Sequence, residues 1–333
     1  MSKKQYDIFG IGNALVDLEI QLSESELADA GIEKGVVELI DDAKRSDLLT
    51  AFEPKIRSRA CGGSAANTVI GAIQLGCTGF YACKVANDEL GQFYAQDLQE
   101  NGTDSLLGST NLPDGKTGTC FVFVTPDADR SMCSFLGITE TVSIKDIDLN
   151  ALKQSQYLYI EGYLAPSPSG KEAAIQAKKI AEEHGVLTAI TLSDPNMVKF
   201  FKSSFDEMIG SKIDLIFCNE AEAQEFCGSS DENEIVTTFK SLCKAFAITK
   251  GKEGALLYDG QSLITVTSPE VNAVDTTGAG DLFAGTFLAG LCQGMDFKTA
   301  GEKACYAAAQ VIQTYGPRLT PDSIQTTQRF FKT

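Results

Sequence analysis

Tryptophan is absent from the 333-residue sequence, and histidine occurs once, as His184. A single imidazole excludes a Ser-His-Asp triad and any site that needs several histidine ligands. Basic residues are also scarce, with 28 Lys and Arg against 45 Asp and Glu, which gives a formal net charge of −17. Nucleic-acid-binding surfaces need clustered positive charge, so we expect no nucleic-acid partner.

Two further absences concern where the protein works. No apolar run reaches the about 18 residues of a membrane span, and Met1–Asp7 lacks the apolar stretch of a secretory signal. The ten cysteines include no C-x-x-C pair, which indicates reduced thiols rather than a zinc cluster. We expect a cytoplasmic protein without a membrane partner.

The order of patterns along the chain indicates the fold. Strand-like apolar runs at 157–162 and 187–192 alternate with helical patterns at 169–184 and 196–209. This alternation predicts an α/β fold with a mainly parallel sheet and helices on both faces. No linker, repeat or low-complexity tract divides the chain, so we expect one domain over residues 1–333.

A second, smaller sheet is also expected. Residues 116–125 and 130–136 alternate at period two around the turn Pro126-Asp127-Ala128-Asp129, which predicts a hairpin. Segments 15–21 and 36–40 are further short strands that could join it.

The first buried strand ends in the polar segment Gly10–Asp17. Leu15 stands where a dinucleotide-binding motif has its third glycine, so that interpretation is rejected. Asn13 and Asp17 instead place an amide and a carboxylate at a strand end, where α/β proteins bind ligands, and they suit vicinal hydroxyls. The structural alternative is a turn asparagine and a solvated aspartate.

A pair of glycines, Gly62 and Gly63, precedes a helical pattern that ends near Gly76. Adjacent glycines permit a sharp turn and motion about it. Asn67 would lie one turn into this helix and face the same pocket as Asn13. The plain structural interpretation is a strand–helix turn with Ser64 as the N-cap.

The segment Asp275-Thr276-Thr277-Gly278-Ala279-Gly280-Asp281 joins an extended region to an apolar helix. Unpaired N–H groups at a helix start attract anions, and glycines let a phosphate approach them closely. The carboxylate of Asp281 could accept a proton there from an attacking hydroxyl. An N-capping aspartate after a glycine turn is the structural alternative.

Two more strand ends carry candidate groups. Asn219 and Glu222 form a capping-box pattern at a helix start, or they hold Mg²⁺ through water and orient phosphates. Thr249 and Gly251 lie in another glycine turn at a strand end.

In their order, the segments GNALVD (12–17), GGSAAN (62–67), NEAE (219–222) and DTTGAGD (275–281) resemble the ribokinase/PfkB family of carbohydrate and nucleoside kinases. The resemblance implies a ribokinase-like three-layer α/β/α core with a small β-sheet lid at about 15–40 and 116–136. It implies ATP and Mg²⁺ as cofactors. Ribokinases pair through lid strands and adenosine kinase-like members are often monomeric, so both a monomer and a homodimer stay open.

The resemblance also assigns roles residue by residue. It implies that Asp281 is the catalytic base and that Gly278, Ala279 and Gly280 form the anion hole. It implies that the substrate is bound by Asn13, Asp17, Gly62, Gly63 and Asn67. It implies that ATP is bound by Asn219, Thr249, Gly251, Gly278 and Gly280. It places Mg²⁺ at Glu222 through water and a K⁺ site at Asp275 and Thr277.

The expected activity is ATP-dependent transfer of a γ-phosphate to a primary hydroxyl of a nucleoside. Adenosine is the first choice because the opening loop, the glycine pair and the segment EGYLAPSP (161–168) most resemble adenosine kinase-like members. Inosine and guanosine follow, and a free-sugar kinase acting on ribose, fructose or 2-keto-3-deoxygluconate is the alternative. A catalytically silent ligand-binding regulator on the same fold is the alternative from another class.

Overall fold

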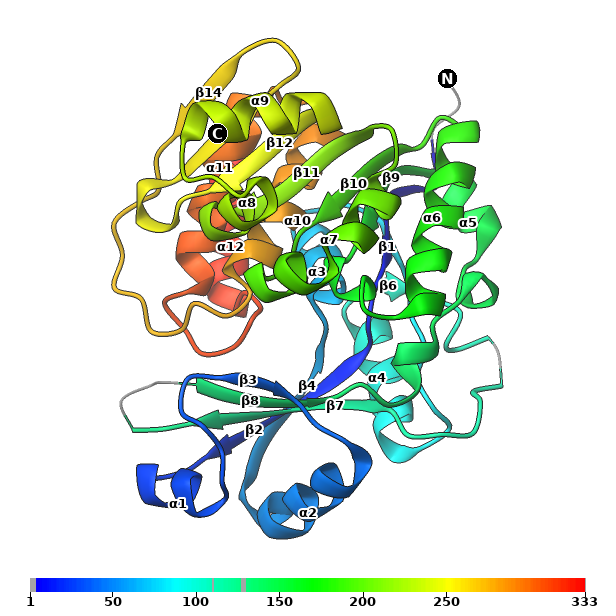
Figure 1. The fold of residues 1–333 in the computed structure, drawn as a ribbon, viewed down its shortest axis with the longest axis vertical. Coiled ribbons are helices and arrows are strands. Elements are labelled where there is room, and N and C mark those ends of the chain that lie inside the picture. The colour runs from blue at the N-terminus through cyan, green and yellow to red at the C-terminus, as the bar shows by residue number, and fades with distance from the viewer. Residues whose placement is uncertain (1–3, 110, 127–129, 333) are drawn as a thin grey trace.

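The computed structural model describes residues 4–109, 111–126 and 130–332. Its main sheet has the strand order β14-β13-β12-β11-β10-β9-β1-β5-β6 (Figure 1). The strands from β12 to β6 pair in parallel, and β13 and β14 add to them as antiparallel strands. The bounds are β1 (Tyr6–Ile11), β5 (Gly79–Ala82), β6 (Thr103–Asp104), β9 (Ser155–Ile160), β10 (Leu187–Thr191), β11 (Ile213–Asn219), β12 (Cys243–Thr249), β13 (Ala255–Tyr258) and β14 (Leu263–Val266).

Helices cover both faces of this sheet because neighbouring strand residues point to opposite sides. Ile8 packs into one apolar cluster and Phe9 into the other. The main-domain helices that contribute to the first cluster are α3 (Ser64–Gln74), α4 (Glu89–Glu100), α10 (Ala279–Cys292), α11 (Phe297–Val311) and α12 (Pro321–Lys332). Those that contribute to the second are α5 (Leu149–Lys153), α6 (Pro168–Glu183), α7 (Pro195–Ile209), α8 (Glu220–Cys227) and α9 (Glu232–Leu242). The expected three-layer α/β/α core is confirmed.

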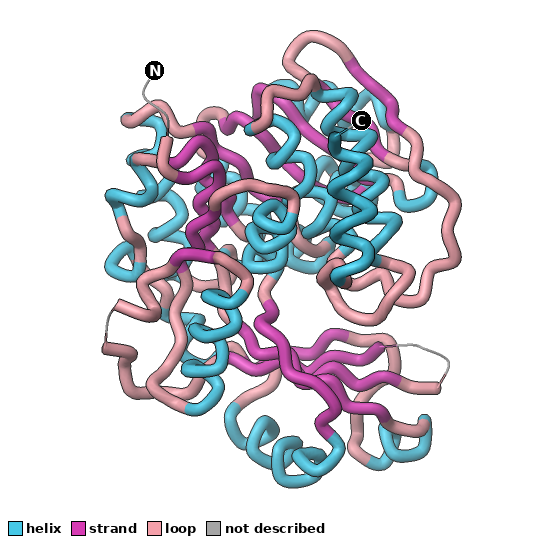
Figure 2. Tube along the Cα trace, turned by 180° about the vertical axis from the view of Figure 1, so that it is seen from behind, coloured by secondary structure: helices cyan, strands magenta, loops and turns pink. Residues whose placement is uncertain are grey.

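The expected second sheet is also present, as a separate layer beneath the main domain (Figures 1 and 2). Its order is β3-β8-β7-β2-β4. The bounds are β2 (Leu15–Gln21), β3 (Val37–Leu39), β4 (Ile56–Gly62), β7 (Gly118–Val124) and β8 (Arg130–Phe135), with α1 (Glu24–Asp29) and α2 (Asp42–Phe52) on its outer face. Strand β4 was not predicted, because its central residues Arg57, Ser58 and Arg59 are exposed and polar. Residues 127–129 of the expected hairpin turn lie outside the described residues.

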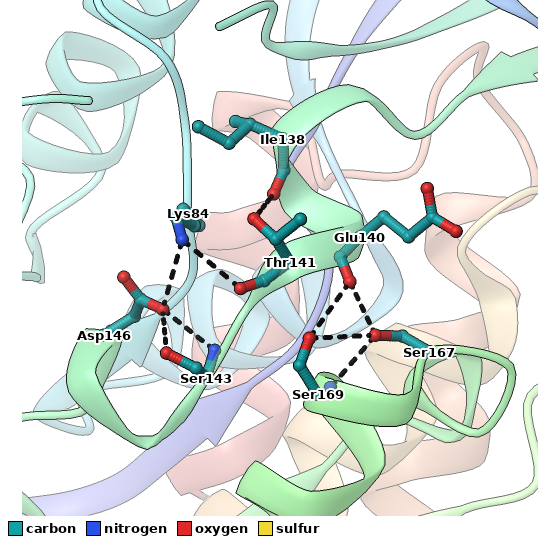
Figure 3. Close-up of polar contacts among 9 residues, drawn as sticks. Lys84, Ile138, Glu140, Thr141, Ser143, Asp146, Ser167 and Ser169 are labelled. Atoms are coloured by element: carbon teal, nitrogen blue, oxygen red, sulfur yellow. Dashed lines mark hydrogen bonds and ion pairs between the residues drawn. The ribbon is translucent and has the colours of Figure 1, made fainter. Parts of the chain in front are cut away.

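The chain returns from β8 to the main domain through 3-10 turns at Gly137–Thr141 and Ile144–Asp146. Figure 3 shows how this return is fixed. Lys84 Nζ donates to the carbonyl of Thr141 at 3.3 Å and lies 3.8 Å from the Asp146 carboxylate. On the other side Ser167 Oγ donates to the carbonyl of Glu140 at 2.6 Å. The end of β8 is therefore anchored to the main domain from two directions. The remaining 3-10 turns are Glu53–Lys55, Gly162–Leu164 and Gly251–Glu253.

Across the described ranges, no helix combines the length and the apolar character that crossing a membrane would require.

Candidate active site

The loop before α10 is shaped by Gly278, which has a left-handed backbone with φ of +75°. A Cβ at this position would lie 2.6 Å from Pro317 Cα, so only glycine fits. Gly278 is the N-cap, and the first helical turn follows as Ala279, Gly280 and Asp281. An α-helix leaves its first N–H groups without intrahelical partners. The loop therefore presents backbone donors beside a carboxylate.

The carboxylate of Asp281 is held by two side chains from α3. Ser64 Oγ donates to Oδ1 at 2.6 Å, and Asn67 Nδ2 donates to Oδ2 at 3.1 Å. Burial raises the pKa of Asp281, and these two hydrogen bonds partly offset that rise. The expected N-cap role of Ser64 is wrong. Gly63 is the N-cap, with φ of +101°, and the helix begins at Ser64, so the hydroxyl binds Asp281 instead.

Asn13 reaches the same place from the end of β1 and is 4% exposed. Its Nδ2 donates to the Tyr163 carbonyl at 3.0 Å, and its own carbonyl accepts from the Tyr81 hydroxyl at 2.9 Å. A Cβ on Gly63 would lie 2.2 Å from that carbonyl oxygen. The glycine pair is thus needed for close backbone packing against Asn13.

Asp17 lies on β2, and its carboxylate packs directly on Gly62, where a Cβ would be 2.2 Å from Oδ1. Burial raises the pKa of Asp17 to about 7, Arg318 and Arg130 oppose the rise, and Asp281 adds to it. The structure therefore brings the five expected substrate-side residues together around Asp281. The structural alternative, a freely solvated aspartate at position 17, does not fit this half-buried side chain.

On the other side of the loop lies a cavity of about 830 Å³. Its lining includes the strand-end and loop residues Thr249, Gly251, Thr276, Ala279 and Gly280. Small or apolar side chains also line it, namely Phe283, Cys305, Ala308, Ala309 and Ile312. Gly278 and Asn219, which we expected to contact ATP, are not among the lining residues. The cavity thus offers apolar surface for a flat base and the start of a helix for an anion.

Asn219 and Glu222 form the capping box that their spacing predicts. Asn219 Oδ1 accepts the Glu222 N–H at 2.8 Å, and Glu222 Oε2 accepts the Asn219 N–H at 3.0 Å. Glu222 is 5% exposed, and its pKa is raised to about 7 by burial and then by Asp194 and Asp281. Among the described residues no group of three or more His, Cys, Asp or Glu side chains could hold a metal. One carboxylate among like charges fits a cation held through water and not a closed metal cage.

The carboxylate of Asp275 binds two backbone N–H groups and one guanidinium group. Its oxygens accept the N–H groups of Thr277 at 3.0 Å and Gly316 at 2.7 Å. Arg130 NH2 lies 2.7 Å from the same carboxylate, and the Arg130 side chain is only 11% exposed. The polar turn that precedes Arg130 in the sequence favours a solvated side chain, and the burial found here overturns that expectation. Because Arg130 belongs to β8, this ion pair joins the second sheet to the loop.

Two residues at the site were missed by sequence analysis. Glu161 follows β9 and is 1% exposed. Arg318 NH1 binds Asp97 Oδ2 at 3.0 Å, and its NH2 also binds the carbonyl of Cys61. No short motif marks either residue. Arg318 could have been suspected because it directly follows the Gly316-Pro317 turn.

The inner face of the second sheet is mainly apolar. On the outer face Val16, Leu18 and Ile20 pack with the residues of α1 and α2. The opposite face turns toward the main domain (Figure 1). Strand pairing places Asp17 beside Cys120, Cys120 beside Ser134, and Ser134 beside Leu39. The next row pairs Glu19 with Val122, then Met132 and Val37, so three of its four side chains are apolar.

Comparison with known proteins finds similar chains among small-molecule kinases. A structure described as a probable sugar kinase from Rhizobium etli is 33% identical, with a TM-score of 0.88 and coverage of 98% of both chains. An adenosine kinase from Sinorhizobium meliloti is also 33% identical, with a TM-score of 0.87, and covers 98% of this chain and 99% of its own. Adenosine kinase from Saccharomyces cerevisiae is 26% identical over 339 residues, which span 94% of this chain and 97% of that protein.

The model of the pfkB family of carbohydrate kinases matches residues 38–324. The chain belongs to this family. It is accordingly a phosphotransferase that acts on an alcohol group of a sugar or nucleoside.

Proposed function

We propose that this kinase transfers the γ-phosphate of ATP to the 5′-hydroxyl of a ribonucleoside, with adenosine as its substrate. The apolar inner face of the second sheet carries this proposal. A nucleoside offers ribose hydroxyls and, beyond them, a flat apolar base. The second sheet offers the carboxylate of Asp17 and, beyond it, the apolar cluster of Cys120, Val122 and Met132 with Leu39 at the edge.

Exposure supports this assignment of the acceptor. Val37 is 66% exposed and Leu39 is 59% exposed, although both are apolar and lie on a strand. Covering such side chains with an aromatic base stabilises the complex through the removal of apolar surface from water. A free sugar such as ribose has no apolar part that could cover them. The second sheet would then act as a lid, as the family resemblance implies.

Asp281 is the group that we assign as the catalytic base. It would take the proton of the 5′-hydroxyl, and the oxygen would then attack the γ-phosphate in line. Ser64 and Asn67 hold its carboxylate through both oxygens, which fixes its orientation. The N–H groups of the loop Gly278-Ala279-Gly280 would stabilise the charge that develops on the transferring phosphoryl group.

The cavity beyond this loop is the proposed ATP site. The adenine would lie against the apolar lining residues Phe283, Cys305 and Ala308, and the phosphates would approach Gly280 at the start of α10. Glu222 would hold Mg²⁺ through water, and the metal supplies charge neutralisation for the phosphates. The carbonyls of Asp275 and Thr277 are the proposed donors for K⁺.

A free-sugar kinase is the second candidate function, since sugar kinases stand among the similar proteins. Kinases of sugar acids would need a cation for the carboxylate. Arg130 already pairs with Asp275, which disfavours that branch. A silent regulator is disfavoured by the arrangement around Asp281, because the loop and both of its partners are intact.

ADP release with ATP and Mg²⁺ tests the proposal. The acceptors are adenosine, inosine, guanosine, ribose, fructose and 2-keto-3-deoxygluconate, each with and without K⁺, with Asp281→Asn as the control. Turnover on a nucleoside supports the proposal. Turnover on a free sugar alone overturns the substrate and keeps the mechanism. Binding of ATP without turnover on any acceptor favours the silent regulator.

A further inference from the structure

The side chain of Glu161 is an unusual group to find in the interior. It is 1% exposed, and burial of a carboxylate is costly unless its charge or its hydrogen bonds are satisfied. No cation pairs with it among the described ion pairs. Its partners are two backbone N–H groups. Oε1 accepts from Asn13 at 3.2 Å and Oε2 accepts from Ala65 at 2.8 Å.

These two N–H groups belong to the two segments that build the acceptor side. Asn13 lies where β1 leaves the main sheet for the second sheet. Ala65 is the second residue of α3, whose first turn carries Ser64 and Asn67. One carboxylate therefore joins the end of β1 to the start of the helix that holds Asp281. The positive end of the α3 dipole also favours a carboxylate at this position.

The segment after Glu161 strengthens the same connection. The Tyr163 carbonyl accepts the Asn13 side-chain amide at 3.0 Å. The next residue in the chain, Ala14, donates its N–H to Thr139 Oγ1 at 2.8 Å. Thr139 belongs to the 3-10 turn Gly137–Thr141, and Figure 3 shows this turn bound to the main domain through Glu140 and Thr141. The crossing from β1 to β2 is thus fixed at successive residues, and Glu161 supplies its link to α3.

Gly12 confirms how closely the carboxylate is fitted. A Cβ at Gly12 would lie 2.3 Å from Glu161 Oε2. The φ of Gly12 is not positive, so a left-handed backbone is not the reason for glycine here. The need for glycine here is therefore steric, and it arises from Glu161.

We propose that Glu161 is a positioning residue for the acceptor side of the active site. Glu161 holds Asn13 and the start of α3 in one geometry. Through Ser64 and Asn67 it also fixes the orientation of Asp281. It touches neither ATP nor the reacting atoms in this account. The nucleotide cavity is lined by other segments, so its geometry does not depend on Glu161. The proximity of Asp281 is also evident electrostatically, since burial and then that carboxylate raise the pKa of Glu161 to about 8.

This inference rests on the proposed function, and its test separates the two. Glu161→Gln keeps the size of the side chain, but its NH₂ group faces an N–H that needs an acceptor. The matched control is Asp214→Asn. Asp214 accepts the Thr188 N–H at 2.7 Å, and it lies near the start of β11, at the strand end away from Asn219. Asp214 also pairs with Lys244 at 2.6 Å. The control thus removes a hydrogen-bonded carboxylate that lies away from the site and joins none of its segments.

Glu161→Gln is expected to lower kcat/KM for the acceptor about 10- to 100-fold, as a displacement of about 1 Å in a reacting group does. KM for ATP is expected to stay within about twofold of the wild-type value. Gly12→Ala should likewise lower kcat/KM for the acceptor and leave KM for ATP nearly unchanged, because its methyl group would displace the Glu161 carboxylate. Its control is Gly108→Ala, since that position has open space around it. Asp214→Asn is expected to lose stability without changing either kinetic value. If Glu161→Gln behaved in the same way, the positioning role would be overturned.

Hydrogen exchange supplies a readout that needs no activity. The amides of Asn13 and Ala65 are expected to exchange faster in Glu161→Gln and to stay protected in Asp214→Asn. Unchanged protection at both amides would overturn the inference even if an acceptor is turned over. Faster exchange in a protein that phosphorylates none of the acceptors would contradict only the proposed function.

Discussion

Two glycines of the loop before α10 are expected to respond to alanine in opposite ways. Gly278 has φ of +75°, and its Cβ would lie 2.6 Å from Pro317 Cα. The left-handed backbone costs about 1–2 kcal/mol for a residue with a Cβ, and overpacking against a rigid backbone costs about 1–3 kcal/mol. We expect Gly278→Ala to lose about 2–5 kcal/mol of unfolding free energy, or to displace the loop.

Gly280 is the contrasting position. It lies in the first turn of α10, and a Cβ there meets no atom within 4 Å. Alanine in a helix is favoured over glycine by about 0.5–1 kcal/mol, so the free protein should be slightly stabilised. Gly280 lines the cavity, however, and the added methyl group should raise KM for ATP.

Urea denaturation of both variants, together with kcat and KM for ATP, measures this difference. Gly278→Ala is expected to lower the urea midpoint and kcat together. Gly280→Ala is expected to raise the midpoint slightly and to weaken ATP binding. Wild-type stability and kcat in Gly278→Ala would refute the reasoning about the loop, as would a large loss of stability in Gly280→Ala.

Three other predictions concern carboxylates of the site. Asp281→Asn should abolish turnover and leave ATP binding, measured by calorimetry, largely intact; near-normal turnover would exclude Asp281 as the base. Ser64→Ala removes a hydrogen bond that lowers the pKa of Asp281, so the acid limb of the kcat profile should move to higher pH, and an unmoved limb would contradict that contact. The pKa values of Asp17, Glu161 and Glu222 are raised to about 7, 8 and 7 from ordinary values of 3.8, 4.5 and 4.5. The folded protein therefore binds more protons than the unfolded chain between about pH 4 and pH 8. The resulting stability is fully present below that window and is lost as pH rises through it, at up to about 1.4 kcal/mol per pH unit and group. Denaturation midpoints should fall from pH 5.5 to pH 8, and less so in Glu161→Gln; a rising midpoint would contradict this.

The parts of the site that were predictable are those made by local sequence. Gly278 and Gly280 with Asp281 define the passage from a loop to a helix within seven residues, and Asn219 with Glu222 defines a capping box within four. Such patterns depend on backbone geometry near in the chain. They could be identified before any fold was known.

The parts that were missed depend on distant contacts. Glu161 binds the backbone of Asn13, 148 residues away, and of Ala65, 96 residues away, and no spacing rule connects them. Arg130 follows a polar turn, which is typical of a solvated residue. Only the fold, which places β8 near the loop, shows that Arg130 pairs with Asp275. Strand β4 carries charged side chains because it lies at a sheet edge, where alternation is weak.

The nature of the phosphorylated product tests the central claim most directly. The enzyme would be incubated with adenosine, ATP and Mg²⁺, and the product would be identified by mass spectrometry and ³¹P NMR. The account predicts adenosine carrying a phosphate on its 5′-oxygen, formed in step with ADP and absent with Asp281→Asn. ADP formed only with a free sugar, with adenosine left unmodified, would contradict the claim that the inner face of the second sheet receives a nucleoside base.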